Sequence, residues 1–477
     1  MPTNRQPIDV FARDLSPEVR TSVIDASRKK VLSRASMLFG DFAHANDLRK
    51  QAGMLKQHTL EHLDQYLEQA VTAMEANGVK VHFAVDAESA RRQITEIYRA
   101  AGVTRICKSK SMVTEEIHLR PHLEKEGFET VETDLGEYIV QLDDDHPSHI
   151  VTPIVHKNRR QIAETFEKHG LGAYNDDPET ITRRARKKLR QAYLSATGTM
   201  TGANFVSAES GRIAIATNEG NSRFGLAGAK VHIAVVGIEK LVPTDRDLAV
   251  FLNLLGRSAT GQHLTVYTEF VRGPKSAEQP EGPEAMHVVF VDNGRTETLA
   301  SDCQEALRCI RCGACLNVCP IFRQASGHAY RHTYPGPIGA ILAPNLVGKD
   351  NFPALADLPK ASTLCGACNE ACPVDIPIPD LLLKLRNRGK KEKAPKATIA
   401  APGMGPWANM AIRPAFWKAA LLGGHVMNVL PPSFLMHPSA QTWLKDRTLP
   451  AWQGNGFRRW MKNREKSPQP KEPTSRG

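Results

Sequence analysis

The sequence lacks the loops by which many nucleotide-binding enzymes are recognised. Neither the dinucleotide pattern G-x-G-x-x-G nor the P-loop pattern G-x-x-x-x-G-K-[ST] occurs between residues 78 and 299, where short apolar runs alternate with amphipathic stretches. This region therefore carries no fingerprint for a nucleotide bound in either way.

Long apolar runs are also missing. No stretch reaches the roughly 18 apolar residues that predict a membrane-spanning helix. Residues 1–20 contain no apolar core of a secretory signal. We therefore expect a cytoplasmic protein in a reducing compartment, where disulfides are rare.

Extremes of composition are absent too. Hydrophobic residues make up 41% and charged residues 24%, which excludes a largely disordered, collagen-like or coiled-coil chain. The length of 477 residues favours about three domains at roughly 150 residues each. The 62 Lys and Arg against 51 Asp and Glu give a charge of +11, which favours acidic partners such as nucleic acid, an anionic membrane surface or an acidic protein.

The sequence does contain nine cysteines, seven of them in two tight groups. The first group runs from Cys309 to Pro320 as C-x2-C-x2-C-x3-C-P, the spacing of bacterial ferredoxins. The second runs from Cys365 to Pro373 as C-x2-C-x3-C-P. The odd total argues against a disulfide framework, and zinc, the alternative metal, needs neither a third cysteine at the same interval nor the trailing Cys-Pro. The pattern therefore predicts iron–sulfur clusters.

The spacing has a mechanical reason. Three cysteines at every third residue of a tight loop can point their sulfurs at one cubane, while the loop turns backbone N–H groups toward those sulfurs. Gly313 and Gly366 relieve crowding in the two loops. In two-cluster ferredoxins the cysteine before the proline ligates the other cluster. This predicts two clusters, the first held by Cys309, Cys312, Cys315 and Cys372, and the second by Cys319, Cys365 and Cys368.

The second group departs from the full pattern in one place. A complete group would have a cysteine at position 362, where the sequence has Ser362. Two [4Fe–4S] clusters then require a non-cysteine ligand on the second, for which Ser362 is the positional candidate and Cys303 a further thiol. The alternatives are a [3Fe–4S] second cluster, with Ser362 capping a turn and Cys303 lying in a helix.

Hydrophobic periodicity predicts the secondary structure around these motifs. Residues 7–77 have helical spacing, and the alternation that follows predicts an α/β domain with a largely parallel sheet. Predicted strands cover 79–85, 104–108, 130–134, 205–208, 213–216 and 231–235, with a further strand pair at 265–270 and 286–291. Predicted helices cover 87–101, 119–126, 158–169, 179–193 and 245–255.

The chain is expected to have four parts. These are an N-terminal helical region (1–77), the α/β domain (78–299), an α-helical ferredoxin-type module (300–388), and a basic linker with a C-terminal tail (389–477). The spacer between the cysteine groups contains His328 and His332. The linker has its basic residues over 384–396, and the polar end, 463–477, has a disordered composition.

Three segments of the α/β domain are weaker candidates for ligand binding. The Gly/Thr-rich stretch 197–204 is predicted either to cradle an anion or to form an ordinary turn. The segments 108–111 and 217–223 each follow a predicted strand, where ligands of α/β sheets bind. Lys108, Glu209 and Glu219 are the candidate side chains, with solvated surface positions as the alternative.

Two segments, one basic and one aromatic, are candidate interaction surfaces. The helix around 183–190 has six basic residues in eight but no interleaved aromatics, so a solvated or partner-docking face is expected and nucleic-acid binding is not. Trp407, Trp417 and Trp443 in the tail are candidates for peripheral contact with a membrane surface.

The joint pattern resembles the lactate utilization protein B family. The resemblance rests on R-C-G-A-C at 311–315, Y-P-G-P-I-G at 334–339, S-T-L-C-G-A-C at 362–368 and C-P-V-D-I-P at 372–377. It also includes K-S-K-S-M at 108–112 and T-N-E-G-N at 217–221, and it covers nearly the whole chain. It implies a lactate-utilisation domain, similar to sugar-isomerase and CoA-transferase folds, followed by the two-cluster module.

The resemblance also implies a function that the residues alone do not supply. The family is part of a three-protein bacterial system that oxidises L-lactate to pyruvate. We expect a non-catalytic electron-transfer subunit that takes electrons from a lactate-oxidising partner and passes them toward a respiratory acceptor, at the inner face of the membrane. The cations Arg308, Arg311 and Arg323 would raise the cluster potentials. The alternative is a self-contained hydroxy-acid dehydrogenase whose α/β domain binds the substrate, with Lys108 or Glu219 as participants.

Overall fold

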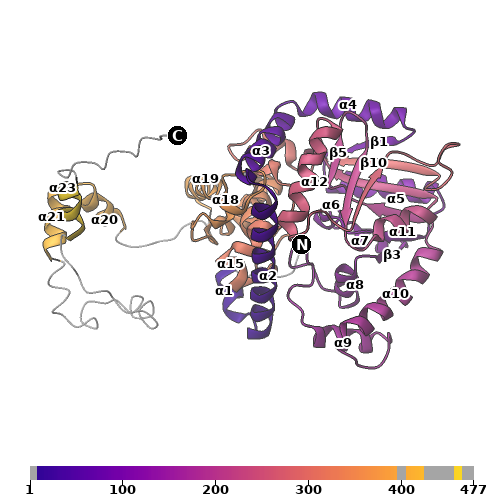
Figure 1. Ribbon diagram of the computed structural model, residues 1–477, viewed down its shortest axis with the longest axis horizontal. Coiled ribbons are helices and arrows are strands. Elements are labelled where there is room, and N and C mark those ends of the chain that lie inside the picture. The colour runs from indigo at the N-terminus through magenta and orange to yellow at the C-terminus, as the bar shows by residue number, and fades with distance from the viewer. Residues whose placement is uncertain (1–7, 395–403, 424–455, 465–477) are drawn as a thin grey trace, which may run out of the picture. The chain divides into compact units, whose positions relative to one another are not determined.

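The computed structural model describes residues 8–394, 404–423 and 456–464, which belong to two units (Figure 1). The first unit, Met1–Thr398, contains both cysteine groups and all the strands found among the described residues. The second unit, Ile399–Gly477, contains the helices α20 (Met404–Ala411), α21 (Pro414–Gly423) and α23 (Gly456–Arg464). Trp443 and residues 465–477 lie outside the described residues.

A six-stranded parallel sheet forms the centre of the α/β region, where the sequence predicted a largely parallel sheet. Its order is β1-β10-β7-β4-β2-β3, and every pairing is parallel. The bounds of its strands are β1 (Lys80–Ala84), β2 (Arg105–Lys108), β3 (Glu129–Glu132), β4 (Gly198–Thr201), β7 (Val231–Gly237) and β10 (Ala285–Val291).

The sheet separates two apolar cores, because alternate side chains of a strand point to opposite faces. In β7, Val231, Ile233 and Val235 enter one core, while Ala234 and Val236 enter the other. Helices α5 (Ala87–Ala100) and α7 (Leu119–Lys125) pack on the first face, and α4 (Leu63–Ala76) packs on the second. Burial on both faces explains why the central strands read as continuous apolar runs.

A second, four-stranded sheet lies in the order β8-β5-β6-β9. Its strands are β5 (Phe205–Ser207), β6 (Ile213–Thr217), β8 (Leu241–Val242) and β9 (Tyr267–Val271). The remaining helices of the α/β region are α6 (Met112–Glu116), α8 (Leu135–Leu142), α9 (Arg159–Lys168), α10 (Pro178–Ser195), α11 (Asn221–Gly228), the 3-10 turn η1 (Ile238–Lys240), α12 (Asp245–Ala259) and α13 (Arg295–Leu299).

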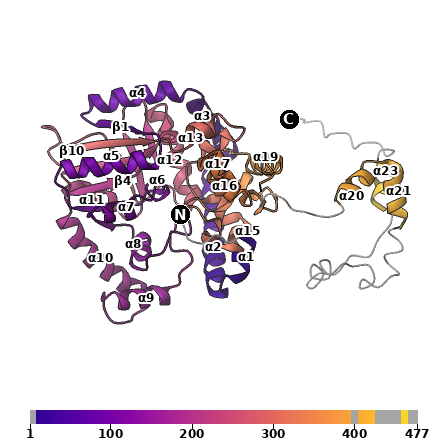
Figure 2. The same ribbon diagram turned by 180° about the vertical axis from the view of Figure 1, so that it is seen from behind.

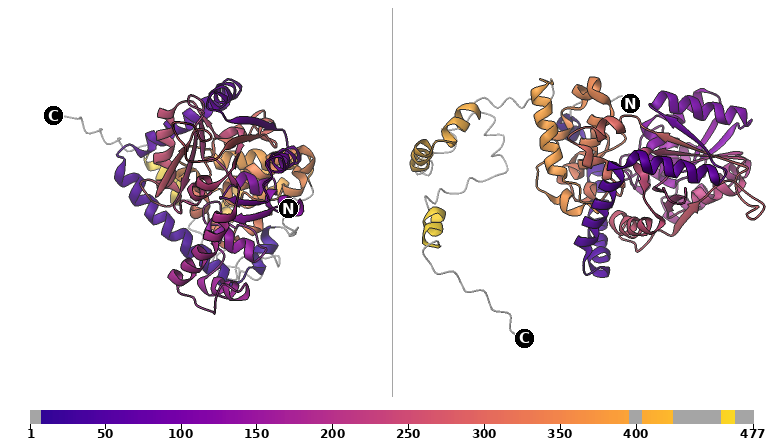
Figure 3. Two further views of the ribbon diagram at one scale, coloured as in Figure 1. Left: turned by 90° about the vertical axis from the view of Figure 1, so that its right-hand side faces the viewer. Right: turned by 90° about the horizontal axis from the view of Figure 1, so that it is seen from above.

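The cysteine module is built from short helices, as predicted. They are η2 (Gln304–Arg308), α14 (Ala314–Val318), α15 (Pro320–Ala325), η3 (His328–Tyr330), α16 (Gly336–Leu346), α17 (Gly348–Leu355), η4 (Leu358–Lys360), α18 (Ala367–Ala371) and α19 (Ile378–Lys391). Figure 2 shows α16, α17 and α19 grouped at the end of the unit away from β10 and α5. The right-hand view in Figure 3 shows the same division.

The N-terminal helices join the cysteine module through a shared core. They are α1 (Ile8–Asp14), α2 (Pro17–Asp41) and α3 (Ala45–Glu61), followed by α4. Val23 and Leu38 of α2 and Ala52 of α3 belong to the same buried cluster as Leu316 and Phe322 of the module. In Figure 1 the indigo helix α2 runs beside α15, with which it is in contact. Residues more than 250 positions apart in the sequence therefore stabilise one another.

Three expectations about local structure were wrong. The Gly/Thr-rich stretch 197–204 was predicted as a loop, but its first half is β4, whose four residues are all buried in the middle of the main sheet. The predicted strand pair at 265–270 and 286–291 falls in two different sheets, as β9 and β10. Residues 384–391, expected to begin a linker, form the last turns of α19, because Leu385 and Gly389 are buried against the module.

Candidate iron–sulfur site

The first cysteine loop lies between η2 and α14 and has the conformation that its spacing requires. Arg311 and Gly313 both adopt left-handed backbone angles, with φ of 61° and 72°, and so fold the chain tightly between Cys309 and Cys315. The N–H of Arg311 donates to Cys309 Sγ at 3.4 Å. A Cβ at Gly313 would lie only 3.0 Å from Cε1 of the buried His149, so both the space and the backbone require glycine.

Four of the seven cysteines line one small cavity, and they come from both groups. Cys309, Cys312 and Cys315 lie with Cys372 against an apolar wall formed by residues such as Ile338 and Ile376. Burial raises the pKa of the Cys312 thiol to about 12 and that of Cys372 to about 11. Converging buried thiols of this kind become thiolates only when a metal centre compensates their charge. The donor set fits an iron–sulfur cluster.

The other three cysteines also lie within electrostatic reach of one another. Burial is the main cause that raises the pKa of Cys368 to about 12, and Cys319 and Cys365 raise it further. The N–H of Phe322 donates to Cys319 Sγ at 3.5 Å. Cys365 is exposed, whereas Cys319 and Cys368 are buried, so this set of three cysteines reaches the protein surface.

The two candidates for an extra ligand differ in their surroundings. Ser362, three residues before Cys365, is half-buried. Its Oγ accepts a hydrogen bond from the N–H of Leu364 at 3.1 Å. Cys303 is fully buried, and its thiol lies 3.6 Å from Asp302 Oδ1. Among the described residues, the polar neighbours of Cys303 are Ser301, Asp302, Asn345 and Lys384 rather than any of the seven cysteines.

The N-terminal helices supply cations to the cysteine loops, which sequence reasoning did not anticipate. Arg49 of α3 donates from Nε to the carbonyl of Cys372 at 2.8 Å and from Nη2 to that of Asn369 at 3.1 Å. Arg34 of α2 donates to the carbonyl of Ala371 at 2.9 Å. Both side chains are buried, so they fix the second cysteine loop and place positive charge beside it.

A buried chain of ion pairs connects the first cysteine loop with the α/β region. Arg311 donates to Glu239 at 3.0 Å, Arg295 donates to both Glu239 and Glu116, and Tyr334 donates to Glu116 at 2.6 Å. Burial opposes ionisation of Glu239, but Arg295 and Arg311 lower its pKa to about 2. Each of the two acids in this series of ion pairs, Glu116 and Glu239, has a basic partner, which makes their charges tolerable in the interior.

A cavity of about 330 Å³ lies beyond the carboxyl ends of β2, β4 and β7. Residues 109–113, 202–204 and 217–222 line it on the α/β side, and Arg311 and Tyr334 of the cysteine module also belong to its wall. Ligands of parallel α/β sheets bind at this end of the strands. The cavity therefore adjoins the loop that carries Cys309 and Cys312.

The structure corrects the candidate side chains in the α/β region. Lys108 does not face the cavity but is fully buried, with its ammonium within 4 Å of Glu115, Glu132 and Glu137. Glu219 does line the cavity, where burial, together with Asp134, raises its pKa to about 7. Glu209 instead accepts from the N–H of Asp245 at the start of α12, which is a structural role.

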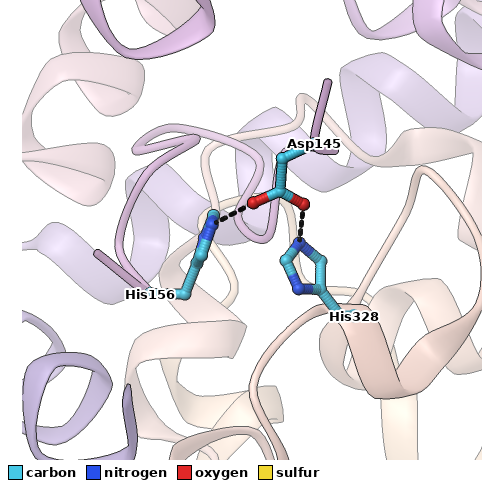
Figure 4. A group of neighbouring side chains, drawn as sticks. All are labelled: Asp145, His156 and His328. Atoms are coloured by element: carbon cyan, nitrogen blue, oxygen red, sulfur yellow. Dashed lines mark hydrogen bonds and ion pairs between the residues drawn. The ribbon is translucent and has the colours of Figure 1, made fainter. Parts of the chain in front are cut away.

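Asp145 lies between His156 and His328, where the α/β region meets the cysteine module, and His328 Nε2 is 3.8 Å from Asp145 Oδ1 (Figure 4). His156 Nε2–H donates to Asp145 at 2.9 Å, and its Nδ1 lies 2.6 Å from Ser148 Oγ. His328 Nε2–H donates to the carbonyl of His146 at 2.7 Å. Both ring nitrogens of His156 are thus already engaged, and the arrangement needs no ion.

The remaining surface candidates are mostly exposed. Most basic residues of α10 are exposed, and Arg183 pairs with Glu179 on the same helix, whereas the partly buried Arg184 donates to the carbonyl of Ala173 at 2.6 Å. In the second unit Trp407 is half exposed and Trp417 is partly buried. Within the described residues, no helix is both long and apolar enough to cross a membrane.

Comparison with known proteins identifies both parts of the chain. Residues 67–291 match the LUD domain, and residues 305–376 match the 4Fe-4S dicluster domain. Lactate utilization protein B of Shouchella clausii is 42% identical over 94% of each chain, and that of Anoxybacillus flavithermus is 43% identical over 86% of this chain and 87% of the other. The electron transport protein YkgF of Escherichia coli, itself described as uncharacterized, is 39% identical over 95% of this chain and 97% of its own. The chain, an α/β LUD domain followed by a 4Fe-4S dicluster module, belongs to the lactate utilization protein B family.

Proposed function

We propose that this protein is an iron–sulfur electron-transfer subunit in the oxidation of L-lactate to pyruvate. The observation that carries the proposal is that the seven cysteines fall into two sets in space. The set of four around Cys309 is gathered near the α/β cavity, and the set of three that includes Cys365 reaches the surface. The names of the relatives supply lactate utilisation and electron transport. Oxidation of lactate to pyruvate releases two electrons and two protons, which suits a chain with two one-electron centres.

The proposed ligands follow the crosswise assignment. Cys309, Cys312, Cys315 and Cys372 hold cluster one, and Cys319, Cys365 and Cys368 hold cluster two. We propose that both are [4Fe–4S] clusters, with [3Fe–4S] as the alternative for cluster two. The protein's own contribution is to set the potentials through backbone N–H···S bonds and buried cations such as Arg34 and Arg311.

The positions of the two cysteine sets suggest a direction for electron transfer, from the interior to the surface. Cluster one would lie in the interior next to Arg311, and cluster two would lie where Cys365 is exposed. Electron transfer between proteins requires a centre near the surface, so the surroundings of Cys365 are the proposed contact for a redox partner. The partners proposed are the other lactate-utilisation subunits and a respiratory electron acceptor.

The second unit is the proposed point of peripheral membrane contact at the cytoplasmic face. Trp407, Ile412 and Phe416 are exposed on α20, α21 and the turn between them, beside the cations Arg413 and Lys418. Exposed aromatic and basic side chains together favour an anionic lipid interface. Binding to vesicles with phosphatidylglycerol, lost on removal of residues 399–477, is the expected result; equal binding of the shortened chain would contradict it.

A self-contained hydroxy-acid dehydrogenase is the second candidate function. It is favoured by the cavity, whose wall includes both Glu219 of the LUD domain and Arg311 of the cysteine loop. Lactate-dependent reduction of a dye by the isolated holoprotein discriminates between the two. We expect that L-lactate does not reduce the dye through the isolated protein when the partner subunits are absent. Protein whose clusters were first reduced chemically should reduce the dye. Turnover of L-lactate by the isolated protein would favour the dehydrogenase.

A further inference from the structure

Lys240 differs from the other deeply buried lysines of the described chain. It is only 7% exposed, lies at the end of η1 directly after β7, and lines the cavity beside Arg311. Lys56 donates to two carbonyls, and Lys108 is surrounded by three carboxylates. The ammonium of Lys240 has no hydrogen bond or ion pair to any described residue. The ammonium is not among the fully enclosed polar atoms of the described chain, so it is open to the cavity that the residue lines. A cation largely removed from water is stabilised by an anionic partner, and the cavity is where such a partner can reach Lys240.

The other charged groups of the cavity wall already have partners. Lys110 donates to the carbonyl of Val151 at 2.6 Å, and Arg311 donates from Nη2 to Glu239, although its buried Nε has no partner among the described residues. Asp134 accepts from the first N–H groups of α8, and Glu219 accepts from the N–H of Leu135. Lys240 is therefore the cation of the wall that makes neither a hydrogen bond nor an ion pair with a described residue.

Neutral hydrogen-bond donors lie on the same wall. The amide oxygen of Asn204 accepts from the N–H of Ala216, and that of Asn221 accepts from the Thr217 hydroxyl. Neither side-chain NH₂ group donates to another described residue, and Asn221 is buried. Both amides thus retain donors for a polar ligand.

The rest of the cavity limits the ligand's charge and shape. Apolar side chains, among them Ile215 and Val235, form part of the wall. The acids Asp134 and Glu219 disfavour a ligand with two negative charges. A volume of about 330 Å³ is near the lower end for ligand sites, which favours a small molecule.

We propose that this cavity binds a small monocarboxylate with a short apolar tail, whose carboxylate pairs with Lys240. Short 2-hydroxy and 2-oxo acids belong to this class, because their second oxygen can accept from a side-chain amide. The class follows from the cavity alone, whereas the choice of L-lactate and pyruvate as probes rests on the proposed function. Arg311 links the cavity with cluster one, since its backbone N–H donates to Cys309 Sγ.

The test is calorimetric titration of the anaerobic holoprotein with L-lactate, pyruvate and inorganic phosphate at constant ionic strength. We expect saturable binding of L-lactate or pyruvate and none of phosphate. Lys240→Met should weaken that binding by at least about tenfold. The matched control is Lys230→Met, which changes an exposed lysine at the opposite end of β7 and should bind as the wild type does.

Asn221→Asp is a second variant, which keeps the test open if Lys240→Met fails to fold. It keeps the side-chain shape and places a negative charge in the cavity, so it should also weaken binding of the carboxylate. The proposal is overturned if the wild type binds neither acid, if phosphate binds as tightly, or if both variants bind like the wild type. Iron content and chemical reduction of the clusters are measured on the same samples. Loss of cluster reduction with carboxylate binding intact would count against the electron-transfer function alone, and the reverse result against this inference alone.

Discussion

Ser362 has the same place in the second cysteine loop that Cys309 has in the first. Ser362 Oγ accepts from the N–H of Leu364 at 3.1 Å, and Cys309 Sγ accepts from the N–H of Arg311 at 3.4 Å. Leu364 and Arg311 both have left-handed backbones, with φ of 55° and 61°. The loops thus share one conformation, and the serine oxygen occupies the position of a ligand sulfur.

This relationship makes Ser362 the first residue to change. We expect Ser362→Cys to give about eight irons per chain and no isotropic resonance in the oxidised state. Ser362→Ala should give about seven irons and the isotropic signal of a [3Fe–4S] cluster. A wild type that already has about seven irons and this signal, unchanged by Ser362→Ala, would show that the oxygen is not a ligand.

The crosswise assignment predicts which cysteine variants behave alike. Cys372→Ser should abolish the same paramagnetic signal as Cys309→Ser, although the two residues belong to different groups. Cys319→Ser should abolish the signal that Cys368→Ser abolishes. Cys303→Ala is the control and should retain both signals. If Cys372→Ser instead matched Cys368→Ser, each group would hold its own cluster and the assignment would be wrong.

Arg49→Ala is expected to destabilise the cysteine module from a distant part of the sequence. The change removes two charge-assisted hydrogen bonds and leaves the carbonyls of Cys372 and Asn369 without these donors. We expect a loss of about 3 kcal/mol, seen as a lower thermal midpoint of the holoprotein and faster release of iron. Arg28→Ala, at an exposed position of α2, is the matched control. Equal midpoints for the two variants would show that Arg49 has no such role.

The lowered pKa of Lys56 predicts that the free energy of unfolding increases with pH. Burial lowers its pKa to about 7, from an ordinary value of 10.5 that the unfolded chain retains. Between these values the unfolded chain binds a proton that the folded chain has released, so the free energy of unfolding increases with pH. The increase attributable to Lys56 should be about 2 kcal/mol between pH 7 and pH 9.

Urea unfolding at several pH values measures this effect. Lys56→Met should show a smaller increase between pH 7 and pH 9 than the wild type, because its side chain does not titrate. Lys50→Met, on the same helix but exposed, should retain the wild-type slope. Parallel curves for the wild type and Lys56→Met would contradict the lowered pKa.

The sequence predicted those features that depend on local spacing. The seven cysteines were evident because ferredoxin loops bind through short, regular intervals, and apolar runs such as 231–235 predicted buried parallel strands. By contrast, β4 was missed because its Gly/Thr-rich sequence has turn character, and its strand conformation depends on pairing with β2 and β7.

Tertiary contacts explain the other differences. The contact between Arg49 and Cys372 joins residues 323 positions apart, so no local pattern indicates it. Lys108 was expected to face a ligand because it ends a strand, but three acidic side chains from other elements surround it. No local pattern singles out Lys240, because its lack of a partner is a property of the folded cavity.

The central claim, a two-cluster electron carrier, is tested most directly by the metal content of anaerobically purified protein. Iron and acid-labile sulfide would be measured together with electron paramagnetic resonance before and after chemical reduction. We predict about eight irons with matching sulfide, and magnetically coupled signals that appear on reduction. Zinc in place of iron, or iron that gives no signal on reduction, would contradict the account.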